Sequence, residues 1–218
     1  MRRKYLGVLL IALFTLTIAS EAPAEDRAGE VAQWNFDVYL NDKKVGKHLF
    51  KVSEMGGIRQ VLSEAKFKYT ILFIPAYRYE HSAAERWEDE CLVEIDARTD
   101  ANGERMQVAG ERTGSGFRLV AGETPAEFPE CVMTFAYWNP DFLDQPRLLN
   151  PQTGELVDVN VEKVGDEVLE VRGEPVAATR FKLTAYDIDL TLWYSADDEW
   201  LALESVAAGG HIIRYELS

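Results

Sequence analysis

Few residues in this 218-residue chain stand in a pattern that could do chemistry. His48, His81 and His211 lie in three distant segments, with no second ligand beside them at the spacing of a metal site. Ser63 and Lys66 have the Ser-x-x-Lys spacing of an amine-activated serine nucleophile. Residues three apart in a strand point to opposite faces, however, so we expect no catalytic pair there. The sequence therefore predicts no catalytic residue, no metal and no cofactor.

Carboxylates are the most abundant reactive groups. The chain carries 37 Asp and Glu against 23 Lys and Arg, a formal net charge of −14. This balance disfavours nucleic acid as a partner, because phosphate binding requires clustered basic residues. A pair of carboxylates could serve as the acid and base of an envelope hydrolase, and this stays an alternative to a solvated acidic surface. Candidates are concentrated in one segment: Glu80, Glu85, Glu88, Asp89, Glu90, Glu94 and Asp96.

Aromatic residues gather in two segments, 69–87 and 128–142, which we expect to lie in or beside irregular stretches rather than inside strands. Aromatic rings with polar groups suit a pocket that holds an apolar body and orients it with a few hydrogen bonds. We predict a non-enzymatic protein that binds an apolar or amphipathic ligand, with lipids among the candidates. An ordinary core is the alternative, as is a structural or assembly partner of an unknown envelope protein. The predicted ligand-binding residues are Tyr69, Tyr77, Tyr79, Trp87, Tyr137 and Trp138.

The first residues are typical of an export signal. Arg2-Arg3-Lys4 precedes an apolar run from Leu6 to Ile18 and a small-residue segment ending at Ala24. About thirteen apolar residues are too few to span a bilayer, and no later stretch is longer. We expect cleavage after Ala24, by either the general or the twin-arginine route, a flexible leader over 25–32, and a periplasmic protein without a transmembrane segment.

Two cysteines, Cys91 and Cys131, are consistent with an oxidising compartment. We predict a disulfide between them, which would close a loop of about forty residues. Two separate buried thiols remain the alternative, because sequence cannot show that the two residues are close.

Alternation of apolar and polar residues recurs over 33–218 and predicts one antiparallel all-β domain. A first hairpin is expected over 34–52, and Asn102-Gly103 is a strong turn signal between two further strands. Turns are also expected near Gly165-Asp166 and Gly209-Gly210. The prolines of 121–155 indicate an irregular insertion with short helical turns at 131–138 and 141–145. Short turns between many strands favour a single curved sheet forming a barrel or half-barrel.

Several segments carry a resemblance to an uncharacterised bacterial exported family, domain of unknown function 6134. They are Trp34–Gly46, Tyr77–Tyr79, Glu85–Trp87, Cys91-Leu92, Thr99–Gly103, Phe135–Pro140, Leu148–Gly154 and Leu192–Tyr194 ahead of Trp200. The plan of the chain also resembles, more distantly, lipoprotein carriers whose half-barrel holds acyl chains. The resemblance implies an exported curved-sheet fold and assigns no functional residue.

Overall fold

One long antiparallel sheet dominates the computed structural model, which describes residues 29, 32–71, 74–123, 125–128 and 131–218. The expected signal peptide and nearly all of the expected leader lie outside the described residues. The order of strands in the thirteen-stranded sheet is β11-β12-β13-β14-β15-β1-β2-β3-β4-β5-β6-β7-β8. Every neighbouring pair is antiparallel, and the two edge strands, β11 and β8, do not pair with each other. The sheet is therefore an open, curved half-barrel, as the sequence predicts.

Eight strands make up the N-terminal part of the sheet. They are β1 (Ala32–Leu40), β2 (Lys43–Met55), β3 (Ile58–Ile71), β4 (Ile74–Glu88), β5 (Cys91–Ala101), β6 (Glu104–Thr113), β7 (Gly116–Ala121) and β8 (Pro125–Phe128). The expected hairpins over 34–52 and around Asn102-Gly103 are confirmed, and both turn residues of the latter have positive φ, as a tight hairpin requires. Pro125 sits in the edge strand β8, where the missing N–H is tolerated.

The C-terminal strands form the other part. They are β11 (Asn160–Val171), β12 (Glu174–Thr184), β13 (Asp189–Ser195), β14 (Trp200–Ala207) and β15 (His211–Leu217), with the 3-10 turn η2 (Ala208–Gly210) before the last strand. The expected turn at Gly165-Asp166 is wrong. A single strand continues through it, because the extra residue is absorbed as a register shift between Lys163 and Gly165.

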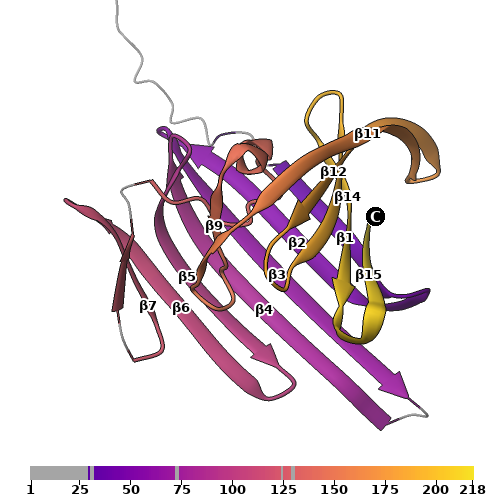
Figure 1. Ribbon diagram of the computed structural model, residues 1–218, viewed down its shortest axis with the longest axis horizontal. Coiled ribbons are helices and arrows are strands. Elements are labelled where there is room, and N and C mark those ends of the chain that lie inside the picture. The colour runs from indigo at the N-terminus through magenta and orange to yellow at the C-terminus, as the bar shows by residue number, and fades with distance from the viewer. Residues whose placement is uncertain (1–28, 30–31, 72–73, 124, 129–130) are drawn as a thin grey trace, which may run out of the picture.

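The insertion between β8 and β11 lies inside the curve of the sheet (Figure 1). It contains the 3-10 helix η1 (Pro140–Asp144) and the small hairpin of β9 (Arg147–Leu149) with β10 (Leu156–Asp158). The expected turn at 141–145 is confirmed, whereas the one at 131–138 is wrong: that segment is irregular and contains one parallel bridge from Thr134 to Leu149. We call residues 131–158, which lie inside this curve, the plug.

Burial explains why the plug stays in place. Its apolar side chains join one core cluster with side chains from both parts of the sheet. Tyr137 packs on Trp200 of β14 with ring centroids 5.2 Å apart, and the Tyr194 hydroxyl of β13 donates to the Tyr137 carbonyl at 2.7 Å. The plug residues that are buried in this core are Val132, Met133, Phe135, Ala136, Trp138, Phe142, Leu148 and Leu149.

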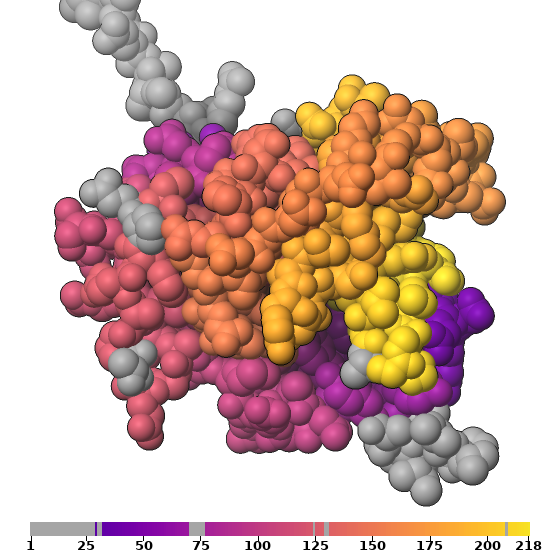
Figure 2. All heavy atoms as spheres, in the orientation of Figure 1, coloured from indigo at the N-terminus to yellow at the C-terminus, as the bar shows by residue number. Residues whose placement is uncertain are grey.

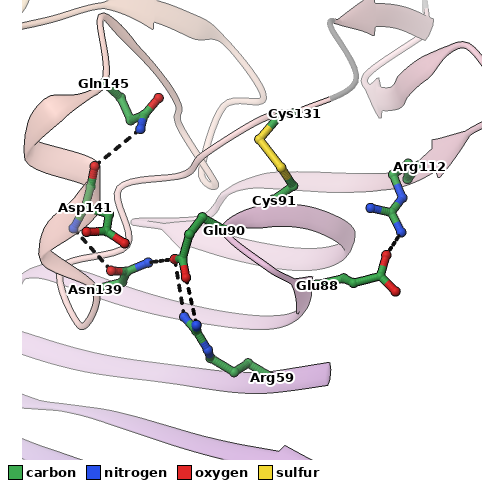
Figure 3. The surroundings of a disulfide bond; sticks show 9 residues. All are labelled: Arg59, Glu88, Glu90, Cys91, Arg112, Cys131, Asn139, Asp141 and Gln145. Atoms are coloured by element: carbon green, nitrogen blue, oxygen red, sulfur yellow. Dashed lines mark hydrogen bonds and ion pairs between the residues drawn. A yellow bond between two sulfur atoms is a disulfide. The ribbon is translucent and has the colours of Figure 1, made fainter. Parts of the chain in front are cut away.

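The predicted disulfide joins the start of the plug to the sheet (Figure 3). Cys91 and Cys131 are bonded with their Cα atoms 4.9 Å apart. Beside them, Glu90 accepts from Arg59 of β3 at 2.8 Å and from the Asn139 side chain of the plug at 2.5 Å. These contacts attach the plug to the β4–β5 turn and so place its aromatic residues against the inner face of β4.

Candidate functional site

A cavity of about 390 Å³ remains between the plug and the inner face of the sheet. Its walls come from β2, β3 and β4, from the plug, and from β13 to β15 across the curve. Figure 2 shows the orange-to-yellow C-terminal strands meeting the magenta N-terminal strands across one face, with a recess between them. Tyr77 and Asp187 are exposed lining residues, whereas His48, Ser63 and Glu85 are buried. The cavity thus has an exposed mouth and a buried interior.

Aromatic rings make up a large part of the wall. Phe67 and Tyr79 stack with centroids 5.3 Å apart, and Tyr215 meets Phe67 edge-on at 6.2 Å. The Tyr79 hydroxyl donates to Oε1 of Gln152 in the plug at 3.0 Å, which ties β4 to the plug at the rim. The rings that line the cavity are Phe50, Phe67, Tyr77, Tyr79, Phe135, Tyr137, Trp138 and Tyr215.

Two neutral histidines lie in the buried part of the cavity. His48 contacts the Ser63 hydroxyl through Nε2 at 2.7 Å and the Tyr215 hydroxyl through Nδ1 at 3.3 Å. His81 contacts Thr99 through Nδ1 at 2.8 Å. Burial lowers the pKa of His48 to about 3 and that of His81 to about 4, because a buried imidazolium loses its hydration. Both rings are therefore uncharged near pH 7.

The contact of Ser63 with His48 has the geometry of a nucleophile and its base. A base with a pKa of about 3 removes a proton poorly at neutral pH, however. The group that orients His48 is a tyrosine hydroxyl rather than a carboxylate. The arrangement is better suited to offering neutral hydrogen-bond donors and acceptors to a molecule in the cavity.

Glu85 is the buried carboxyl group of the cavity, with 8% of its surface exposed. Its Oε2 accepts from the Trp87 indole N–H at 3.0 Å, and the Thr134 side chain of the plug also hydrogen-bonds to it. Burial raises the pKa of Glu85 to about 7, although both hydrogen bonds lower it in part. The group therefore changes charge close to neutral pH.

The structure brings four of the six predicted ligand-binding residues to this cavity: Tyr77, Tyr79, Tyr137 and Trp138. Trp87 is fully buried behind it, where its ring packs edge-on against Trp138. Tyr69 lies outside the lining residues, with the Lys43 ammonium 4.8 Å from its ring. The expectation that the aromatic residues of 69–87 lie outside strands is wrong, because this segment belongs to the paired strands β3 and β4 apart from 72 and 73, which lie outside the described residues.

Sequence reasoning considered Glu85 only for a hydrolase and the histidines only as metal ligands, and it did not assign these buried polar groups to the ligand-binding site. Tyr79, His81, Ala83, Glu85 and Trp87 alternate along the inner face of β4. A histidine and a glutamate on the apolar face of an alternating strand are the signal that could have identified them. The Ser63 and Lys66 side chains lie on opposite faces, as expected.

Two further observations bear on the site. Within the described part of the chain, no group of three or more His, Cys, Asp or Glu side chains is placed to hold a metal ion. None of the helices described is both long and apolar enough to cross a bilayer.

Comparison with known proteins places the chain in a family. Residues 36–218 match the family model named domain of unknown function, DUF6134. The chain belongs to the DUF6134 family. A search of curated proteins found no match to the chain. A similar solved structure is that of a beta-barrel-like protein of domain of unknown function DUF1849 from Brucella abortus, with a TM-score of 0.62 and 5% identity over 85% of this chain and 94% of that chain. At that identity the likeness concerns the fold alone.

Proposed function

We propose that this protein is a non-enzymatic periplasmic binding protein whose cavity holds a small amphipathic molecule. The observation that carries the proposal is the cavity itself, whose volume of about 390 Å³ lies within the range of about 300 to 1,000 Å³ usual for ligand pockets. Aromatic walls would bury the apolar part of the ligand. His48, Ser63 and Glu85 would meet its polar group.

The two alternative functions have weaker support. A hydrolase with paired carboxylates would need two of them close together, and the cavity combines the buried Glu85 with Asp187, which is exposed. An assembly partner would need a large contiguous apolar patch. The exposed large apolar residues described are instead spread over many elements: Met55, Leu62, Tyr77, Val120, Val164, Val168, Tyr186 and Val206.

Binding of the neutral fluorescent probe N-phenyl-1-naphthylamine tests the proposal. Ala83 lines the cavity, whereas its neighbour Ala84 is exposed on the opposite face of β4. We expect saturable binding that Ala83→Phe abolishes, because the new ring fills the cavity, and that Ala84→Phe leaves unchanged. Near-ultraviolet circular dichroism would show that both variants are folded. Failure of the probe to bind the unaltered protein, or equal loss in the two variants, would contradict the proposal.

Native mass spectrometry of protein released gently from the cell envelope provides a second measurement. We expect an added mass that is lost on denaturation and is reduced in Ala83→Phe. A homogeneous unliganded protein that also takes up none of the offered amphiphiles would count against binding.

A further inference from the structure

The charged groups that line the cavity indicate which class of ligand it would bind. Lysine and arginine are both missing from its described lining residues, whereas two carboxyl groups, Glu85 and Asp187, are present. We propose that the cavity selects organic cations, amines or quaternary ammonium groups that carry an apolar body, over neutral and anionic amphiphiles. This inference rests on the proposed binding function.

Aromatic rings provide the first argument for a cation. A cation over the face of an aromatic ring, within about 6 Å of its centre, is attracted by the electron-rich face of the ring. Phe67, Tyr79 and Tyr215 lie on strands that converge on the cavity, with centroid separations of 5.3 Å for Phe67 with Tyr79 and 6.2 Å for Phe67 with Tyr215. Tyr137 and Trp138 extend this set from the plug side. Such a group of rings can surround an ammonium group without forming hydrogen bonds to it.

Glu85 provides the second argument. Its hydrogen-bond partners, Trp87 and Thr134, are neutral donors, and the cross-strand neighbours of Glu85 are Val61 on β3 and Ile95 on β5. A buried carboxylate without a cationic partner is costly, and an incoming ammonium group would supply that partner.

The other titratable groups of the cavity do not compete for this role. His48 on β2 and His81 on β4 are neutral near pH 7, and the tyrosines at 77, 79, 137 and 215 have pKa values raised by burial. Asp187 lies at the exposed mouth, where its negative charge attracts cations. An anionic headgroup would meet carboxylates and no counter-charge from the described lining residues, which disfavours fatty acids and phospholipids.

Three amphiphiles with the same chain test the preference: octyltrimethylammonium, 1-octanol and octanoate. Each is titrated calorimetrically at pH 8, the two ionic compounds below their critical micelle concentrations and octanol below its solubility limit. We expect the cation to bind at least tenfold more tightly than the alcohol, and the octanoate to bind most weakly. Cation binding equal to or weaker than that of octanol or octanoate would overturn the cation preference while leaving the binding function intact. Failure of all three to bind, together with failure of N-phenyl-1-naphthylamine, would instead remove the binding function.

A matched pair of variants locates the selectivity. Glu85→Gln keeps the size of the side chain and removes its charge, whereas Glu94→Gln makes the same change on the exposed face of β5. We expect Glu85→Gln to lower the affinity for octyltrimethylammonium roughly tenfold, the least effect expected for an opposite charge at close range. Octanol binding should be retained, which shows an intact cavity, and Glu94→Gln should change neither. An unchanged affinity for the cation in Glu85→Gln would overturn the inference.

The pH dependence gives an independent reading. The cation must displace the Glu85 proton, which is held up to pH about 7. Affinity for octyltrimethylammonium should therefore rise roughly sevenfold from pH 5.5 to pH 8, close to the tenfold effect of removing the charge, and octanol affinity should not rise with it. In Glu85→Gln the rise should vanish. A cation affinity that does not change over this range in the unaltered protein would contradict the assignment of Glu85 as the paired group.

Discussion

Glu85→Gln should change the pH dependence of stability in a way that can be calculated. In the native protein the Glu85 carboxyl group keeps its proton up to pH about 7, whereas its ordinary pKa is 4.5. Between these values the native state binds more protons than the unfolded chain, so the free energy of unfolding falls as pH rises. The stabilising effect is complete below pH 4.5 and lost above pH 7. Two and a half pH units at about 1.4 kcal/mol each give a total of about 3.5 kcal/mol.

The substitution removes this term, because the amide does not titrate. The difference in the free energy of unfolding between the variant and the unaltered protein should therefore shift in favour of the variant by about 2 to 3 kcal/mol from pH 5 to pH 8. Urea unfolding of the oxidised proteins, followed by tryptophan fluorescence at several pH values, measures this difference. Glu94→Gln is the control and should show no such shift. A difference for Glu85→Gln that stays constant from pH 5 to pH 8 would refute the burial argument.

The remaining predictions concern the plug and the histidines. Replacing both Cys91 and Cys131 by serine should lower the free energy of unfolding by about 4 kcal/mol, the value of the chain-entropy model for a loop of this length. Urea unfolding measures this loss. An unchanged midpoint would be inconsistent with a disulfide that constrains the unfolded chain. Tyr194→Phe should lower the free energy of unfolding by about 1 to 3 kcal/mol, because the partly buried Tyr137 carbonyl loses its donor. No loss in thermal unfolding would show that another group replaces the hydroxyl. His48 has its ordinary pKa of 6.5 lowered to about 3, so it destabilises the native state progressively as pH falls below 6.5, by about 1.4 kcal/mol per pH unit. His48→Gln should make the acid limb of the stability curve less steep, and an identical limb would argue that the ring is already solvated.

Local signals in the sequence predicted the elements well. The Asn102-Gly103 turn has two residues that accept positive φ, and it forms the expected hairpin of β5 with β6. Pro75 shows a limit of such signals: proline usually interrupts a strand, yet Pro75 lies within β4 and pairs with Thr70 beside a register shift.

The site depends on long-range pairing that no local pattern contains. His48 and Tyr215 are 167 residues apart in sequence, and they meet because β15 pairs with β1, which in turn pairs with β2. The position of the plug likewise follows from contacts of Tyr137 with β13 and β14. The sequence could suggest a binding role for the aromatic residues of the plug. It could not show which residues of β13 and β14 they would contact.

The pairing of β1 with β15 has a consequence for the order of assembly. All other neighbouring strands in the large sheet are consecutive along the chain, so each half can form from local hairpins. The pairing of β1 with β15 can form only after the last described strand is available. It closes a loop that spans almost the whole domain, and it therefore carries the entropic cost of that loop. A chain that lacks its final strand would therefore have two meanders with unpaired edge strands at Ala32–Leu40 and Trp200–Ala207. This is the stage of assembly that would benefit most from a chaperone.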